Sequence, residues 1–156
     1  MTRRRPFAAG RLMLWLLALA MLGVGMRAHS APPKGDPRLP AAEWKAIKKV
    51  IGDQRAALKA GDAAKAFAQA SPGIRAQFGT PENFLAMVRT AYDALLAARY
   101  VEFLEGAVIE GNVIQPLRLI APDNSVQVAL YTMEKQKDGR WKIAGCALAP
   151  SSVQAV

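Results

Sequence analysis

Histidine and cysteine are almost absent from this chain of 156 residues, which holds one of each, His29 and Cys146. Zinc and iron sites need several histidines, cysteines or carboxylates at ligand spacing, and the acidic residues here are spread along the chain. A serine or cysteine nucleophile usually depends on a neighbouring histidine base. The sequence therefore predicts no catalytic nucleophile, no metal site and no cofactor.

Two further absences narrow the range of functions. No glycine-rich phosphate loop follows a predicted strand, which excludes P-loop and dinucleotide-binding folds. A single cysteine excludes an internal disulfide, and the apolar neighbours Ala144, Ala147 and Leu148 predict a buried, unreactive thiol.

The positive charge of the chain gives little support to a nucleic-acid partner. The net charge is +9, from 21 Lys and Arg against 12 Asp and Glu. Five of the arginines precede residue 31, and the rest of the chain has 16 basic against 12 acidic residues, a net charge of +4. The cluster of Lys45, Lys48 and Lys49 is typical of a solvated helix face, without interleaved aromatic residues for base stacking. We therefore predict no nucleic-acid partner.

Residues 1–30 have the pattern of an export signal. Basic residues 3–5 and Arg11 precede fifteen uncharged residues, 12–26, and small residues end the segment at Ala28 and Ser30. A membrane span needs about twenty apolar residues, so the pattern favours cleavage after Ser30 over an uncleaved anchor. Cleavage would remove the chain's histidine. Membrane contact is expected only through this segment.

This segment predicts a periplasmic or secreted protein. Residues 4–7, Arg-Arg-Pro-Phe, fit the core of a twin-arginine signal, but the rest of that pattern is missing, so the twin-arginine and general secretory routes both stay open. A proline-rich linker is predicted over residues 31–40, followed by one domain over 41–150 and a short tail over 151–156.

The first half of the domain has helical periodicity. One apolar face, at spacings of three and four, predicts a helix from Ala41 to Gly61; its members are Trp44, Ile47, Ile51, Gln54 and Leu58. A second helix is predicted over 63–70 with Asp62 as its cap. The pairs Ser71-Pro72 and Thr80-Pro81 predict two further starts, of a short turn to Phe78 and of a helix to about Ala91.

The second half has the pattern of strands, predicted over 100–110, 113–121, 126–136 and 141–148. The connections between them are short and rich in Gly, Asn, Asp and Pro. Short connections force antiparallel neighbours, so we predict a four-stranded meander. Helices first and strands after predict an α+β domain with the helices on one face of the sheet.

Several separated motifs, in order, resemble the bacterial domain-of-unknown-function 4864 family over about residues 42–148. They are Ala66-Phe67, Ala70-Ser71-Pro72, Phe78-Gly79-Thr80-Pro81, Phe84, Met87-Val88, Tyr92, Tyr131-Thr132-Met133 and the run 138–146. The resemblance implies small, often exported proteins without an established activity. The plan of helices and a curved sheet is also similar to nuclear transport factor 2-like domains, cone-shaped folds with a pocket between sheet and helices. Catalytic members of that superfamily place Asp and His in the pocket, and no such pair is present here once His29 is removed.

Polar and aromatic residues in or near the predicted strands are the best candidates for lining such a pocket. The predicted ligand-binding residues are Tyr92, Gln115, Arg118, Gln127, Tyr131 and Trp141. The alternative is that the large apolar members simply form the core between sheet and helices.

Three functions from different classes stay open. The first is a non-catalytic module that binds a small apolar or amphipathic ligand or a protein partner. The second is a homodimeric or docking domain that associates through its sheet, steered by Lys135 and Lys142. The third is a carboxylate-dependent hydrolase or isomerase, for which the candidate acids are Asp53, Asp62, Glu102, Glu105 and Glu110.

Overall fold

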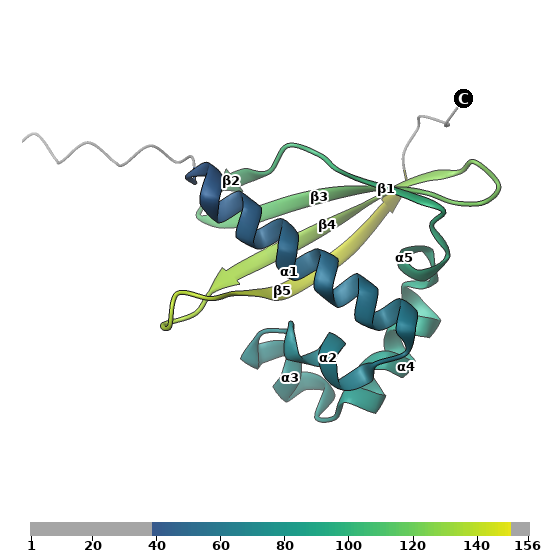
Figure 1. Ribbon diagram of the computed structural model, residues 1–156, viewed down its shortest axis with the longest axis horizontal. Helices are drawn as coiled ribbons and strands as arrows, with labels where there is room; N and C mark the ends of the chain where they lie inside the picture. Colours follow the sequence, from purple (N-terminus) through teal and green to yellow (C-terminus); the bar gives the residue numbers. More distant parts are fainter. Residues whose placement is uncertain (1–38, 151–156) are drawn as a thin grey trace, which may run out of the picture. The chain divides into compact units, whose positions relative to one another are not determined.

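The computed structural model describes residues 39–150, drawn in colour in Figure 1. The predicted export signal, most of the predicted linker and the predicted tail lie outside the described residues. Within 39–150, no helix is both long enough and apolar enough to cross a membrane.

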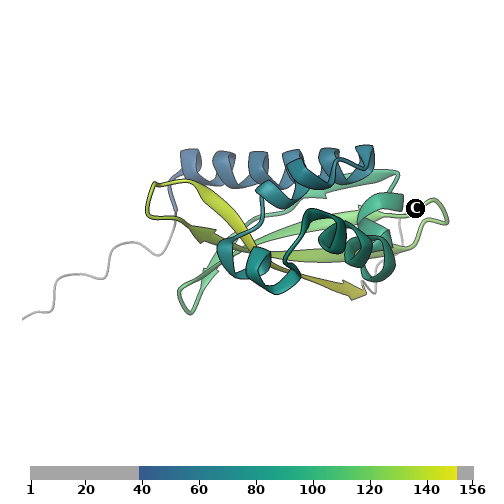
Figure 2. The same ribbon diagram turned by 90° about the horizontal axis from the view of Figure 1, so that it is seen from below.

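Over the described range, a run of five helices is followed by five strands, so the predicted α+β class is confirmed. The helices are α1 (Ala41–Ala60), α2 (Ala63–Ala68), α3 (Pro72–Phe78), α4 (Pro81–Ala91) and α5 (Asp93–Ala97). The strands are β1 (Tyr100–Phe103), β2 (Ala107–Ile109), β3 (Asn112–Ile120), β4 (Val126–Lys135) and β5 (Trp141–Pro150). The arrangement follows the plan of helices on one face of a curved sheet (Figures 1 and 2).

The helix boundaries follow local capping chemistry. The predicted starts of α3 and α4 are confirmed, because the Ser71 and Thr80 side chains accept hydrogen bonds from Ile74 and Asn83 backbone N–H groups. Helix α1 ends where Gly61 adopts the left-handed conformation, with φ of 73°. These caps fix where the chain turns between short helices.

Helix α5 is an addition to the predicted pattern. The chain leaves helical geometry at Tyr92, with φ of −133°, and turns once more over five residues. A segment this short has no second turn in which an apolar face could repeat. Its Leu95 is nevertheless buried against α1 and the sheet.

The sheet has five strands because the first predicted strand is interrupted. Both β1 and β2 pair with β3, which continues antiparallel to β4 and then to β5. The interruption is at Gly106, where an added Cβ would lie 2.3 Å from Cζ3 of Trp44 on α1. The backbone therefore leaves the strand ladder where it approaches the indole ring.

The core consists of two apolar clusters. One lies between α1, α5 and the sheet and includes Ile47, Ile51, Leu117 and Tyr131. The other lies among the C-terminal half of α1, α2 and α4, which Figure 1 shows grouped together. Tyr92 packs against both clusters.

The connection between α2 and α3 lies along the free edge of β5. Ile143 donates its backbone N–H to Gln69 O at 2.9 Å, and Ser71 donates its own to Ile143 O at 2.8 Å. These two bonds form a short parallel bridge between residues of the helical half and β5.

Candidate functional site

A cavity of about 200 Å³ lies between the helices and the sheet, and we name it the interhelix cavity. Its wall comes mainly from α1, α3, α4 and the strands β4 and β5, and is mostly apolar; representative members are Leu58, Ile74, Phe78, Met87, Tyr131, Ile143 and Cys146. A small, largely apolar hollow with a few polar groups is typical of a small-molecule site.

The Tyr131 side chain is the polar group that stands out in this wall. The residue is 0% exposed, and its hydroxyl has no oxygen or nitrogen hydrogen-bond partner among the described residues. Its polar neighbour is the thiol of Cys146, opposite it in the strand register, and a thiol is a weak hydrogen-bonding group. Burial raises the pKa of Tyr131 far above its usual value, so the side chain is a neutral phenol. Buried hydroxyl groups nearly always have a partner, and this one lies at the wall of a cavity.

Two α1 residues add polar groups near the same region. Gln54 is 3% exposed, lines the cavity, and donates through Nε2 to Ala66 O at 3.3 Å. Arg55 donates through Nη2 to Leu95 O at 3.2 Å. Burial lowers the pKa of the Arg55 guanidinium, which still carries its charge.

Tyr92 and Cys146 line the interhelix cavity on its β5 side. The Tyr92 hydroxyl donates to the Cys146 backbone carbonyl at 2.8 Å, so it is satisfied, unlike that of Tyr131. Burial raises the pKa of the Cys146 thiol to about 12. The thiol is therefore protonated at neutral pH and is a poor nucleophile.

The six predicted ligand-binding residues do not lie together. Tyr92 and Tyr131 line the interhelix cavity, whereas Gln115 lines a second hollow beside α1. Arg118 pairs with Glu102 at 2.7 Å on the face of the sheet opposite to the helices. Gln127 lies opposite Leu119 in the strand register and lines neither hollow.

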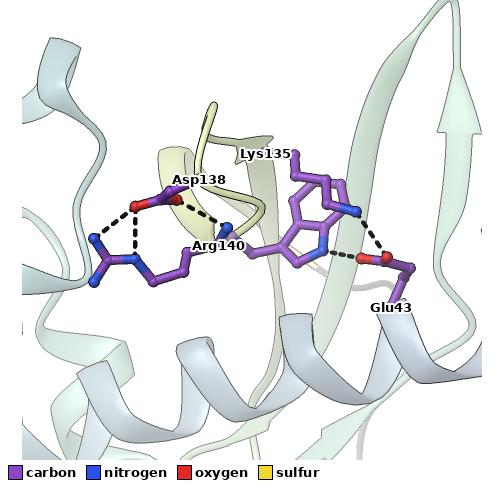
Figure 3. Close-up of polar contacts among 5 residues, drawn as sticks. Glu43, Lys135, Asp138 and Arg140 are labelled. Carbon is purple, nitrogen blue, oxygen red and sulfur yellow. Dashed lines mark hydrogen bonds and ion pairs between the residues drawn. The ribbon is translucent and has the colours of Figure 1, made fainter.

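Trp141 is a core residue whose ring N–H makes a hydrogen bond to a carboxylate. It is 6% exposed, and its Nε1 donates to Glu43 Oε2 at 2.5 Å. Glu43 also accepts from Lys135 Nζ at 2.7 Å, and Figure 3 shows this pair beside the Asp138–Arg140 ion pair of the same hairpin. These contacts join the start of α1 to the β4–β5 hairpin.

Lys135 and Lys142, the residues predicted to steer association, both contact the helical side. Lys135 binds Glu43 on α1, and Lys142 Nζ donates to Ala68 O at 2.5 Å. Neither is among the residues that line the hollow on the opposite face.

Carboxylates are missing from the lining of the interhelix cavity among the described residues. Asp53 pairs with Lys49, and Asp62 pairs with Lys65 and caps α2. No group of three or more metal-binding side chains occurs within residues 39–150. The candidate acids within residues 39–150 thus lie outside this cavity.

The helical wall of the cavity was not predicted. Its members from α3 and α4 include Ile74, Phe78 and Met87, whose sequence pattern is that of ordinary helix residues. Gln54 did carry a signal, because it is a polar residue at a position of the apolar face of α1. A buried amide at such a position needs a polar partner or a ligand.

A family model for a domain of unknown function, DUF4864, matches residues 40–156. The chain belongs to the DUF4864 family. A solved structure that matches this DUF4864 chain is ActVI-ORFA from Streptomyces coelicolor, with 14% sequence identity and a TM-score of 0.45, over 74% of this chain and 99% of that one. A search of curated protein sequences found no significant match.

Proposed function

We propose that this DUF4864 domain binds one small, mostly apolar molecule in the interhelix cavity, through a hydrogen bond to Tyr131. The observation that carries the proposal is the Tyr131 hydroxyl, which lies at the wall of an apolar cavity with the weakly bonding Cys146 thiol as its neighbour and no oxygen or nitrogen partner. A buried hydroxyl without a partner costs about 1–3 kcal/mol. A ligand that pairs with it recovers part of that cost.

The size of the cavity limits the ligand to about one ring. A cavity of about 150 Å³ is large enough to hold benzene. The interhelix cavity, at about 200 Å³, has room for such a ring with one or two substituents. One substituent should be a hydroxyl, carbonyl or amine, because these groups can pair with the Tyr131 hydroxyl.

Phenol and toluene are suitable probes because they have nearly the same size and differ in one polar atom. We expect the full chain to bind phenol about tenfold more tightly than toluene, which corresponds to about 1.4 kcal/mol. Tyr131→Phe should remove this preference while toluene still binds. Titration followed by NMR would measure both affinities in both proteins. Equal affinities for the two probes in the wild type, or binding of neither, would contradict the proposal.

We also propose that the domain acts in the periplasm or outside the cell. Support comes from the basic start, the uncharged run 12–26 and the small residues before Ala31. The mass of the protein recovered from the periplasm of its host should correspond to a start at Ala31. A full-length protein retained in the membrane fraction would indicate an uncleaved anchor instead.

A second candidate function is homodimerisation through the sheet face opposite to the helices. This outer sheet face is apolar, with a hollow of about 550 Å³ lined by Ala107, Ile109, Ile114, Pro116, Leu130 and Ala147. Ile109 is 56% exposed and Leu130 is 37% exposed. The charges of the Glu102–Arg118 pair on this face balance, which suits a second copy related by a two-fold axis better than a highly charged partner.

Sedimentation over a range of concentrations tests this candidate. The wild type should change from monomer to dimer, and Leu130→Lys should stay monomeric. Lys137→Glu, in the exposed β4–β5 turn, is the control and should dimerise like the wild type. A wild type that stays monomeric at millimolar concentration would rule the candidate out.

A further inference from the structure

A second hollow, of about 750 Å³, lies between the N-terminal half of α1 and strand β2, and we name it the Trp44 groove. Its lining includes Trp44, Lys45, Lys48, Glu105, Val108 and Gln115. Its volume lies within the range of about 300–1,000 Å³ that is typical of small-molecule sites. It shares no lining residue with the interhelix cavity.

Gln115 gives the groove a fixed, unpaired acceptor. The side chain is 0% exposed, and its Nε2 donates to the carbonyls of Leu104 at 2.8 Å and Pro116 at 2.9 Å. Because both partners are acceptors, the side-chain amide cannot be flipped to exchange its nitrogen and oxygen positions. Its Oε1 is buried without a hydrogen-bond partner among the described residues. A ligand with an N–H donor would satisfy it.

The apolar side of the groove is built by close packing. Gly106 lies directly against the Trp44 ring, where an added Cβ would come within 2.3 Å of it. Val108 continues the apolar surface on β2. An aliphatic side chain could therefore lie against the indole ring.

Charged side chains of both signs line the groove, two cations from α1 and one anion from the β1–β2 connection. Lys45 and Lys48 lie three residues apart on α1, which puts them on one helix face. Lys48 Nζ also lies 5.9 Å from the centroid of the Phe103 ring, on the strand side. Glu105 follows Leu104, whose carbonyl accepts from Gln115. The groove thus offers acceptors for a cation from Gln115 and Glu105, and donors for an anion from α1.

We propose that the Trp44 groove binds a short apolar peptide of about dipeptide size in its zwitterionic form. The peptide ammonium donates to Gln115 Oε1 and pairs with Glu105. The peptide carboxylate pairs with Lys45 and Lys48, and an aliphatic side chain packs on Trp44. The groove volume, about 750 Å³, has room for two aliphatic residues.

Calorimetric titration of the full chain with leucyl-leucine tests the proposal, together with two blocked forms of the same peptide. N-acetyl-leucyl-leucine lacks the ammonium, and leucyl-leucine amide lacks the carboxylate. We expect leucyl-leucine to bind. Each blocked form should bind about two- to five-fold more weakly, which is the effect expected from losing one exposed ion pair. Equal affinity for the three forms, or no binding of leucyl-leucine at millimolar concentration, would overturn it.

Surface variants locate the two ends of the peptide. Glu105→Gln should weaken leucyl-leucine binding and leave the acetylated peptide unchanged, whereas Lys48→Met should weaken the acetylated peptide but not the amide. Lys49→Met is the matched control, because Lys49 is next in the chain but pairs with Asp53 at 2.7 Å and does not line the groove. A Lys49→Met effect as large as that of Lys48→Met would contradict the assignment. Tyr131→Phe should leave peptide binding unchanged, so this test is independent of the interhelix cavity.

Discussion

At the level of single residues, two tyrosine hydroxyls near the interhelix cavity differ in their hydrogen bonding. The Tyr92 hydroxyl donates to Cys146 O, whereas that of Tyr131 has no oxygen or nitrogen partner among the described residues and lies beside the Cys146 thiol. In the ligand-free protein, the first hydroxyl stabilises the fold and the second costs free energy. The same substitution should therefore have opposite effects at these two positions.

Tyr92→Phe should destabilise the protein by about 0.5–1.5 kcal/mol, since a hydrogen bond is lost. Tyr131→Phe should stabilise it by about 1 kcal/mol, since a buried hydroxyl without a partner is removed. Urea unfolding of the two variants and the wild type measures both changes. A destabilised Tyr131→Phe variant would mean that the hydroxyl is already satisfied, and it would remove the basis of the proposed ligand contact.

Sequence patterns could predict polar strand residues but not which cavity they line. Alternation along β3 and β4 put Gln115 and Tyr131 among the candidates, and both are 0% exposed. They lie opposite each other in the strand register and yet line different hollows, because Tyr131 meets the C-terminal half of α1 and Gln115 meets its N-terminal half. How α1 lies on the sheet is a tertiary feature which no local spacing encodes.

At the level of elements, the contact between α1 and the β1–β2 connection depends on Gly106. A methyl group at this position would displace the Trp44 ring. Gly106→Ala should destabilise the protein by about 1–3 kcal/mol, the usual cost of overpacking.

Gly52→Ala is the matched control for that substitution. Gly52 lies inside α1 with open space around an added Cβ, so alanine should stabilise the helix by about 0.5–1 kcal/mol. Thermal unfolding of both variants measures the two effects. A neutral Gly106→Ala would show that the indole ring moves freely, and the interruption between β1 and β2 would then need another cause.

The link between α1 and the β4–β5 hairpin should depend on pH. Hydrogen bonds from Lys135 and then from Trp141 hold the pKa of Glu43 below its usual value. A lowered folded-state pKa stabilises the fold above the unfolded pKa of about 4.3, and this contribution is lost as the pH falls through the folded value. The melting temperature of Glu43→Gln should therefore be below that of the wild type at pH 7, and the difference should shrink below pH ~4.

Lys135→Met provides the control for the charge at Glu43. It should reproduce most of the loss seen in Glu43→Gln at pH 7, and the double variant should lose little more than Glu43→Gln alone, because both substitutions remove the same ion pair while Lys135→Met leaves the Trp141 contact. Additive losses would mean that the two side chains act separately.

Most elements could be predicted because their signals are local. The Ser71-Pro72 and Thr80-Pro81 starts and the turns between the later strands are set by residues within a few positions of each other. Two features could not be predicted, because each depends on packing against residues that are distant in the sequence. The interruption at Gly106 depends on Trp44, and the short helix α5 depends on the core cluster around Leu95.

At the level of the whole molecule, the short helices α2 and α3 contrast with the long central strands of the sheet. Helices α2 and α3 have six and seven residues, and α3 has no buried residue. Isolated helices shorter than about 12 residues are marginal in water. The long strands β3 and β4 are paired on both sides.

Hydrogen exchange should therefore divide the domain into two regions. Amides of α2 and α3 should exchange by local opening at lower free energy than those of β3 and β4. Phenol bound in the interhelix cavity should raise protection in α3 and α4 more than in β2. Mass spectrometry of peptic fragments measures both effects, and uniform protection across the domain would contradict this division.

Both edges of the sheet are interrupted, and this affects how readily another chain could add a strand. An exposed strand edge is a template on which another chain can add a strand. On one side that edge is divided into two strands of four and three residues, and on the other the Gln69–Ser71 segment occupies the backbone groups of Ile143. The first edge thus offers only short stretches to an added strand, and the second is interrupted at Ile143. We expect strand addition at either edge to be less favourable than at an uninterrupted edge strand.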